Sequence, residues 1–259
     1  MRFLIGDLLL ELEGDPGFEV EERWELFLSD RRDDADYRIT RSYVPILPQR
    51  EGAHYFYDGV KCKNYAMTCE HGNHLEVLAL QETLPWGLKL RQLYEEFALP
   101  HILLLKERLV LHASYICYAD RAILFTAPSG TGKSTQAELW RLHRGAEILN
   151  GDRAVIGLRE GVPYAFGFPM SGSSDYCVNR SLPLCAVVHL SQGPENVIRR
   201  LKGREALRVL LNGTYSDPKH PEDFIRNMNT AISLLDTPVF ALSCRPDVGA
   251  VEALEEALG

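Results

Sequence analysis

A glycine-rich segment near the middle of the chain has the residue types that bind phosphate. Residues 127–135 read Ala-Pro-Ser-Gly-Thr-Gly-Lys-Ser-Thr and follow an apolar run that ends at Thr126. Glycines let the backbone aim several N–H groups at one point, and the lysine and serine reach phosphate oxygens and a bound Mg²⁺. This is the Walker A spacing, with Ala127 at the position of the first glycine. The residues predicted to bind the nucleotide are Ser129, Gly130, Thr131, Gly132, Lys133, Ser134 and Thr135.

The sequence on either side favours a phosphate loop over a simpler alternative. The alternative is a glycine-rich turn that caps a helix and leaves Lys133 and Ser134 in solvent. A phosphate loop needs a strand before it and a helix after it, because the helix adds its N-terminal amides and its dipole. Both are indicated here, with an amphipathic stretch over about residues 134–143. The segment therefore predicts a P-loop that binds a nucleotide triphosphate.

Two further side chains are candidates for the chemistry. Asp152 follows a short predicted strand 19 residues after Lys133, where it could take a proton from a hydroxyl group or bind Mg²⁺. The alternative is a turn residue in the sequence Asn-Gly-Asp. His112 lies on an earlier apolar run, residues 109–118, where it could orient an acceptor or contact phosphate. It could equally be a histidine of the core.

Three stretches together resemble the catalytic core of HPr kinase/phosphorylase. They are 109–114, 129–134 and 145–153, within a close match over about residues 105–160. More narrowly, the chain resembles HPr-kinase-like proteins, which share a nucleotide fold of the phosphoenolpyruvate-carboxykinase type. Some of these are peptide-serine kinases of natural-product pathways, and others carry the ATP-dependent carboxykinase label.

The resemblance implies roles for individual residues and implies ATP and Mg²⁺ as cofactors. Lys133 matches the loop lysine, Ser134 the metal-binding serine, and His112 the histidine on the preceding strand. Asp152 matches the second of two adjacent acids, which implies a role as base and as a second Mg²⁺ ligand. The first of those acids is Gly151 here, Thr135 replaces a glutamate, and the downstream signature for HPr is missing. HPr itself is therefore not the expected acceptor.

The combined expectation is an ATP- and Mg²⁺-dependent phosphotransferase, a kinase acting on a serine-type hydroxyl group in a peptide or small molecule. Two alternatives stay open. One is a lyase similar to phosphoenolpyruvate carboxykinase, and the other is a nucleotide-binding regulator without catalysis. The expected partners are a nucleotide triphosphate and the hydroxyl acceptor, and a homo-oligomer is left open.

Other polar residues have weaker patterns. The sequence Gly172-Ser-Ser could form a second anion-binding nest or be an ordinary loop. The spacing of Cys62, Cys69, His71 and His74 matches no standard zinc pattern. The arginines considered as phosphate or substrate contacts are Arg153, Arg180, Arg199, Arg200 and Arg204.

Composition narrows the class of partner. The chain has 259 residues and a formal net charge of −8, which argues against nucleic acid or an anionic membrane as the main partner. It contains no apolar stretch long enough to span a membrane, and its first residues do not resemble a signal peptide. The six cysteines are scattered, as in proteins that keep reduced thiols. These features predict a cytoplasmic protein.

The predicted fold class is mixed α/β, with a largely antiparallel sheet, a P-loop and flanking helices, as in HPr kinase and phosphoenolpyruvate carboxykinase. Residues 1–83 are expected to be a β-rich N-terminal region, and residues 84–259 a P-loop kinase-like core, with one continuous domain as the alternative. In the N-terminal region the pattern indicates an antiparallel sheet, with strands at 3–12, 24–28, 37–46, 54–57, 65–68 and 75–80.

The core begins with a helix marked by apolar residues from Trp86 to Phe97, which residues 101–105 extend or follow. Hairpins are expected at 109–126 and 154–168, turning at Ala119-Asp120 and Glu160-Gly161. Further strands are predicted at 147–149, 184–190 and 239–244, and further helices at 203–211, 221–235 and 248–258.

Overall fold

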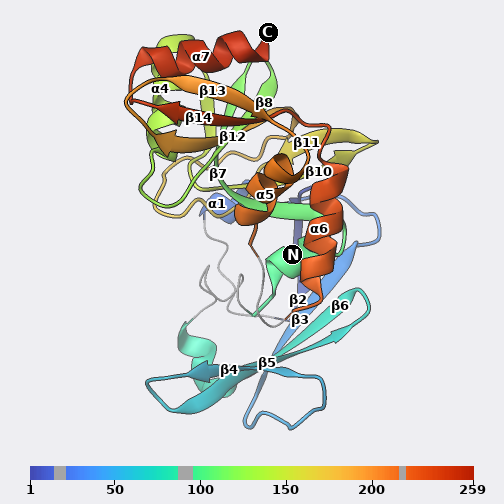
Figure 1. The fold of residues 1–259 in the computed structure, drawn as a ribbon. Helices are drawn as coiled ribbons and strands as arrows, with labels where there is room; N and C mark the ends of the chain where they lie inside the picture. Colours follow the sequence, from blue (N-terminus) through green and yellow to red (C-terminus); the bar gives the residue numbers. More distant parts are fainter. Residues whose placement is uncertain (15–21, 87–95, 216–219) are drawn as a thin grey trace.

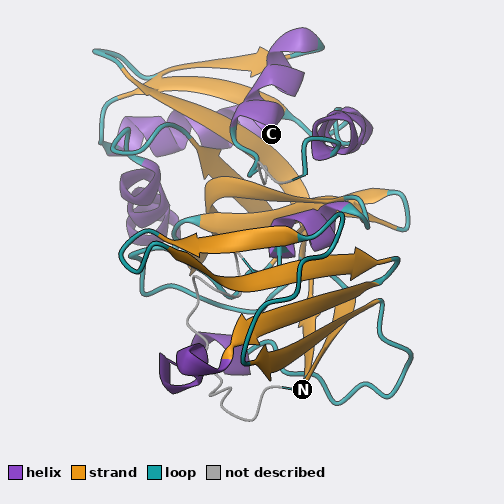
Figure 2. Cartoon of the chain, turned by 90° about the horizontal axis from the view of Figure 1, so that it is seen from below, coloured by secondary structure: helices purple, strands orange, loops and turns teal. Residues whose placement is uncertain are grey.

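The strands of the protein form two sheets, one from each part of the chain (Figure 1). The computed structural model describes residues 1–14, 22–86, 96–215 and 220–259. Seen from below, most helices lie around the strands, and a short helix lies among them near the middle of the view (Figure 2). The fold is mixed α/β with largely antiparallel pairing, as the sequence predicted. Among the described helices, none is long and apolar enough to cross a membrane.

The N-terminal sheet has six strands in the order β1-β2-β3-β6-β5-β4. The expected single strand over 3–12 is two strands, because Gly6 and Asp7 both adopt positive φ and turn the chain into a hairpin. The strands are β1 (Arg2–Ile5), β2 (Leu8–Glu13), β3 (Tyr37–Val44), β4 (His54–Asp58), β5 (Lys63–His71) and β6 (His74–Leu80).

Two expectations for this region were wrong. The sheet is not wholly antiparallel, because β3 pairs in parallel with both β2 and β6. Residues 24–28 are not a strand either: helix α1 (Glu22–Glu25) ends there, and only Leu28 forms an isolated bridge, with Phe3. The Trp24 side chain of α1 is buried against the ring of Phe3, so burial of the aromatic group decided the local structure. A 3₁₀ helix, η1 (Gln81–Trp86), follows β6.

The second sheet has eight strands and carries the phosphate loop. Its order is β11-β10-β7-β8-β12-β14-β13, and β9 pairs with β7. Strands β8, β12 and β14 run parallel, and the other pairings are antiparallel. The strands are β7 (Arg108–Tyr118), β8 (Arg121–Thr126), β9 (Glu147–Asn150), β10 (Arg153–Arg159), β11 (Val162–Phe166), β12 (Leu182–Gln192), β13 (Val197–Leu201) and β14 (Val239–Cys244).

Both predicted hairpins of this sheet are confirmed, with positive φ at the turn residues Ala119, Asp120, Glu160 and Gly161. Strand β13 was not predicted. It is an edge strand in which Arg199 and Arg200 stand side by side, so its sequence lacks the apolar run of its neighbours. The helix expected between Trp86 and Phe97 falls mostly outside the described residues. Residues 101–105 mainly belong to α3 (Leu99–Leu104).

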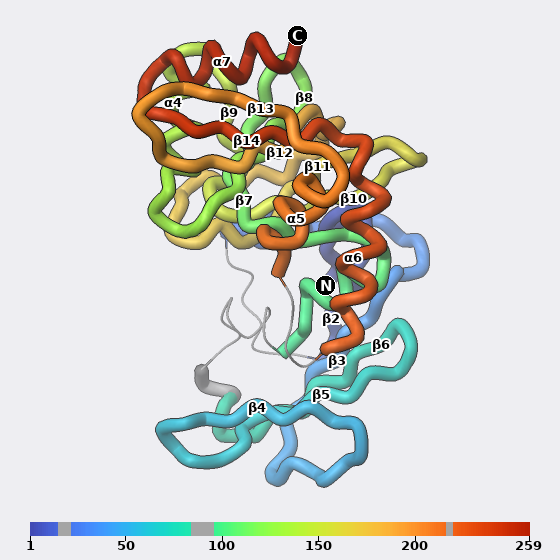
Figure 3. Tube along the Cα trace, in the orientation of Figure 1, coloured from blue at the N-terminus to red at the C-terminus, as the bar shows by residue number. Residues whose placement is uncertain are grey.

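Helices cover both faces of the second sheet. Helices α4 (Lys133–Arg144) and α7 (Val248–Leu258) pack on one face through Trp140 and Leu254. Helices α5 (Arg204–Asn212) and α6 (Asp223–Ser233) pack on the other through Leu210 and Ala231. In Figure 3, α6 extends from the second sheet toward the N-terminal sheet. Alternate residues of the central strand β8 face the two helical layers.

The two sheets share one hydrophobic cluster. It joins Ile5 and Val77 of the N-terminal sheet to Val155 and Phe166 of the second sheet, and Ile102 of α3 lies within it. These side chains are at most 1% exposed. A core built from both parts couples their stabilities, because neither face can lose its partner without exposing apolar surface. The proposed boundary between residues 83 and 84 stays a prediction.

Replacement of Ile102 by alanine tests this coupling. Ile102 is fully buried, so we expect the free energy of unfolding to fall by about 2–5 kcal/mol. The measurement is urea unfolding followed by tryptophan fluorescence and by far-ultraviolet circular dichroism. Both signals should change in one transition, shifted to lower urea, whereas Ile46→Ala at a 79% exposed position should leave it unchanged. Two separate transitions would contradict a shared core.

Candidate active site

The phosphate loop connects β8 to α4 in the conformation that its glycines allow. Gly130 has φ +78° and Gly132 has φ +119°, both in the region that residues with a side chain avoid. Gly132 is also the N-cap residue of α4, directly before its first helical residue Lys133. A Cβ atom on either glycine would meet nothing within 4 Å among the described residues, so φ, and not crowding, requires glycine. The loop leaves this space open beside its backbone.

The first turn of α4 faces that space. Gly132 supplies no side-chain cap, and among the described residues none caps the helix in its place. The first N–H groups of a helix have no intrahelical acceptor and carry a partial positive charge, so they favour an anion. Ser134 and Thr135, in the same turn, are exposed. The strand, loop and helix predicted from the sequence are therefore confirmed as local structure.

The Lys133 side chain is folded back along the loop. Its Nζ donates a hydrogen bond to the Ala127 carbonyl oxygen at 3.0 Å, and the residue is 7% exposed. Burial lowers the pKa of this ammonium group, and the nearby Asp152 carboxylate opposes that change. An ammonium group has three donors. A phosphate bound in the open space would therefore offer the Lys133 ammonium group hydrogen-bond acceptors in place of the water that burial has removed.

Asp152 and His112 are brought together by the pairing of β7 with β10. The register places His112 opposite Arg153, and His112 Nε2 lies 3.1 Å from Asp152 Oδ1. Burial and the Lys133 charge lower the pKa of His112, while Asp152 raises it in part. A lowered pKa keeps the ring neutral at pH 7, so Nε2–H donates to the carboxylate. His112 and Asp152 are thus in contact, and the Asp152 charge acts on Lys133, while the catalytic roles of these three residues stay predictions.

Of the arginines considered from sequence, Arg153 lies at this site. Its Nε is 3.4 Å from Asp152 Oδ2, and its guanidinium lies over the Tyr215 ring at 4.8 Å. Arg180 instead pairs with Glu147 and Asp120, and Arg199 pairs with Glu205. Arg200 and Arg204 are exposed. Arg153 and His112 therefore hold opposite oxygens of the Asp152 carboxylate.

Sequence reasoning did not identify Asn150, which shapes the turn that carries Asp152. Its Oδ1 accepts hydrogen bonds from the backbone N–H groups of Asp152 and Arg153 at 3.0 and 2.9 Å. Its Nδ2 donates to the carbonyl oxygens of Phe168 and Met170. The side chain is fully buried. An asparagine just before Gly-Asp is a turn signal, and only its burial reveals that it ties two loops together.

Asn150→Ala should therefore damage both stability and the site. Four backbone groups would lose their partner, which we expect to cost about 2–4 kcal/mol of folding free energy. Thermal unfolding measures this loss. In the folded fraction, the rate of any reaction that uses Asp152 should also fall, because the carboxylate is no longer held. Asn64→Ala, at an exposed position of β5, is the control and should change neither quantity.

The Gly172 loop packs directly against Asp152. A Cβ on Gly172 would lie 2.9 Å from the Asp152 carboxyl carbon, and Gly172 has φ +57°. A Cβ on Gly151 would lie 2.1 Å from Ser174 Oγ. The space that a side chain at position 151 would need is thus filled by the Ser174 hydroxyl group. The anion-binding role considered for residues 172–174 stays a prediction.

A residue of the N-terminal region also reaches this loop. Arg23 of α1 donates from NH1 to Ser171 Oγ at 2.6 Å, and Ser171 Oγ in turn donates to the Ser174 carbonyl oxygen. The Arg23 side chain is 30% exposed. Nothing in the local sequence around Arg23 indicates this contact, since the two residues are 148 positions apart. The wall of the site beside Asp152 is therefore built by both parts of the chain.

On the other side of the phosphate loop lies an open pocket of about 410 Å³. It is bounded by the carboxyl ends of β12 and β14, which run parallel to β8, and ligands of open α/β sheets bind at such ends. The Oε1 atom of Gln136 is buried in its wall without a hydrogen-bond partner among the described residues. Its lining residues are Gly130, Thr131, Gly132, Thr135, Gln136, Leu190, Gln192, Gly193, Cys244, Arg245 and Pro246.

Comparison with known proteins adds little to this geometry. No family model matches the chain, and no curated protein matches it. Among solved structures, the Hpr(Ser) kinase/phosphatase from Coxiella burnetii is similar, with a TM-score of 0.35 and 10% sequence identity. The match covers 57% of this chain and 94% of that one. A similarity of this size carries no argument about activity, so the function rests on the site.

Proposed function

We propose that this protein is an ATP- and Mg²⁺-dependent phosphotransferase that acts on a hydroxyl group. The observation that carries the proposal is the position of Asp152. Its carboxylate lies 3.1 Å from His112 Nε2 and 3.4 Å from Arg153 Nε, and its negative charge opposes the effect of burial on the pKa of Lys133. A carboxylate beside a phosphate-binding lysine is the arrangement that transfer of a phosphoryl group to a hydroxyl group needs.

The residues present fit a nucleotide triphosphate. Open space adjoins Gly130 and Gly132, and Lys133 can add a positive charge at this loop. The neighbouring pocket of about 410 Å³ has room for a nucleoside, whose donor groups would satisfy the unpaired Gln136 Oε1. The Ser134 hydroxyl and the Asp152 carboxylate are the oxygen ligands that would hold Mg²⁺. When bound, Mg²⁺ neutralises phosphate charge.

In the proposed reaction, the acceptor hydroxyl oxygen attacks the γ-phosphorus. The bond from that phosphorus to the bridging oxygen breaks, and ADP leaves. The hydroxyl proton goes to an oxygen of Asp152, which His112 and Arg153 hold in place. Lys133 and the loop amides stabilise the charge on the phosphate oxygens. Asp152 as a base and Asp152 as a metal ligand are both compatible with this scheme.

For the acceptor, we propose a serine-type hydroxyl group in a peptide, with a small molecule as the alternative. The resemblance of residues 105–160 to HPr-kinase-like proteins supports the serine. The net charge of −8 disfavours an acidic acceptor and so favours a neutral or basic peptide. The contribution of Arg23 to the wall beside Asp152 supports a role of the N-terminal region in acceptor binding.

The test is transfer of labelled γ-phosphate from ATP with Mg²⁺ to a panel of serine peptides and hydroxylated metabolites. A phosphomonoester identified by ³¹P nuclear magnetic resonance and mass spectrometry is the expected product. Tight ATP binding without transfer to any member would favour a nucleotide-binding regulator. ATP consumption that requires oxaloacetate would instead favour the carboxykinase-like lyase.

A further inference from the structure

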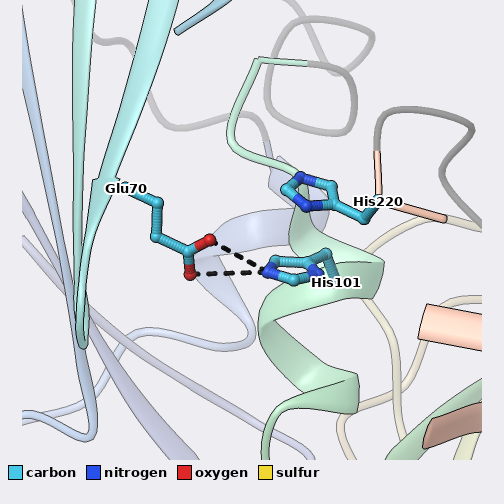
Figure 4. Close-up of side chains that lie close together, drawn as sticks. All are labelled: Glu70, His101 and His220. Carbon is cyan, nitrogen blue, oxygen red and sulfur yellow. Dashed lines mark hydrogen bonds and ion pairs between the residues drawn. The ribbon is translucent and has the colours of Figure 1, made fainter. Parts of the chain in front are cut away.

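A second cluster of ionisable side chains lies where the N-terminal sheet meets α3 and α6. Glu70 belongs to β5, His101 to α3, and His220 precedes α6 (Figure 4). One ligand-type atom from each of the three lies within 4.8 Å of the other two. His101 is 3% exposed and His220 is 8% exposed. None of these residues takes part in the site proposed for phosphoryl transfer.

Each histidine of the cluster is held by a carboxylate at its Nδ1 atom. Asp223 Oδ2 lies 2.8 Å from His101 Nδ1, and Glu222 Oε1 lies 3.2 Å from His220 Nδ1. A carboxylate at Nδ1 holds a proton there, so each ring can bind a metal ion through Nε2 when that nitrogen carries no proton. His101 Nε2 faces Glu70, 3.2 Å from Oε2. Such carboxylate–histidine pairs are characteristic of the outer shell of metal sites.

The third ligand is also oriented by a neighbour. The Tyr37 hydroxyl group donates to Glu70 Oε1 at 2.6 Å, and both Glu70 oxygens face His101 Nε2, with Oε1 at 3.4 Å and Oε2 at 3.2 Å. Among the described residues, the carboxylates of Glu70, Glu222 and Asp223 contact the two histidines, and the Arg226 guanidinium lies 3.1 Å from Asp223. The His101 and His220 rings stack at 3.6 Å with 14° between their planes. His220, the more exposed ring, would rotate for both lone pairs to converge.

We propose that Glu70, His101 and His220 bind one Zn²⁺ ion. Two imidazoles and a carboxylate are ligands that zinc favours, whereas Mg²⁺ and Ca²⁺ prefer all-oxygen sites. The ion would connect β5, α3 and the start of α6, and would thereby fasten the N-terminal sheet to the helices of the second sheet. In the described part of the chain, Cys62, Cys69, His71 and His74 belong to no cluster of possible metal ligands.

The test is zinc binding by the full chain after removal of metal with a chelator. Equilibrium dialysis with elemental analysis should find one Zn²⁺ per chain, and zinc should raise the unfolding temperature. Co²⁺ in its place should give visible absorption bands, which report the ligand set independently of activity. Glu70→Gln and His220→Asn should each weaken binding at least about 10-fold, and Asp223→Asn by about 10- to 100-fold. The control, His143→Asn, lies at the exposed end of α4 and should have no effect.

Three outcomes would overturn the proposal. The first is absence of stoichiometric zinc in the wild-type chain, which would leave the cluster a network of ion pairs. The second is unchanged zinc affinity in Glu70→Gln and His220→Asn variants that circular dichroism shows to be folded. The third is zinc that His220→Asn retains and Asp152→Asn loses, which would place the ion at the phosphate loop.

Discussion

Lys133→Ala is expected to remove ATP turnover and most of the ATP affinity. Lys133 is the cation placed at the phosphate loop, where it is buried with its Nζ directed to the loop carbonyl of Ala127. Alanine leaves the loop backbone and α4 intact but withdraws the charge that opposes the phosphates. In a site of low polarity, one such group stabilises the transition state far more than it would in water.

We expect kcat/KM for ATP to fall by about 10²- to 10³-fold or more, on the scale of losing one preorganised donor. Calorimetry should show weaker ATP binding at the same time. The matched control is Lys202→Ala, an exposed lysine that follows β13 at the opposite end of the sheet from the phosphate loop. Its kinetics should equal those of the wild type. If Lys133→Ala bound and consumed ATP normally, the phosphate-loop assignment would be wrong.

Asp152→Asn is expected to stop phosphoryl transfer while ATP still binds. Asparagine keeps the shape of the side chain and can still accept a hydrogen bond from His112 Nε2. It cannot take the proton of the acceptor hydroxyl group and is a poor ligand for Mg²⁺. Because the loop and Lys133 are unchanged, loss of turnover with retained ATP binding separates this variant from Lys133→Ala.

The expected decrease in kcat is about 10²- to 10⁴-fold, the range of a lost general base. The two possible roles of Asp152 differ in their readouts. If Asp152 is the base, the Asp152→Asn variant should lack the acidic limb of the pH–rate profile. If Asp152 is a metal ligand, the variant should need a higher Mg²⁺ concentration for half-maximal rate. Asp34→Asn, in the exposed loop after α1, is the control. Full activity in Asp152→Asn would leave the proposed mechanism without a base and would refute it.

Features that depend on neighbours in the chain could be predicted from the sequence. The phosphate loop, the hairpin turning at Ala119-Asp120 and the end of α4 at Gly145 follow from glycine conformation, turn chemistry and helix periodicity within short stretches. His112 and Asp152 were each predicted as site residues through resemblance to a family, but their contact was not predicted. The exact pairing that produces it, β7 against β10, is visible in the structure alone.

Features that depend on distant segments could not be predicted in the same way. The parallel pairing of β3 with β2 and β6 depends on how distant segments of the chain meet. The alternation of apolar and polar residues along a strand is the same whether its neighbours are parallel or antiparallel. From the sequence, Trp24 can be expected to be buried because it is a large aromatic residue, but nothing nearby indicates that it lies on a helix. Asn150 looks like an ordinary turn residue until its four backbone partners are seen.

The sequence by itself determined that the chain has a loop suited to phosphate, because backbone conformation and the adjoining lysine and serine are local properties. Tertiary structure decided what stands around that loop. Of the arginines considered from sequence, Arg153 lies beside Asp152, and the Ser174 hydroxyl group fills the space beside Gly151. Arg23, from the N-terminal part of the chain, hydrogen-bonds to the adjacent loop at Ser171. Glu70, His101 and His220 form a cluster only because the folded chain brings β5, α3 and the residues before α6 together, and no spacing along the chain encodes that meeting.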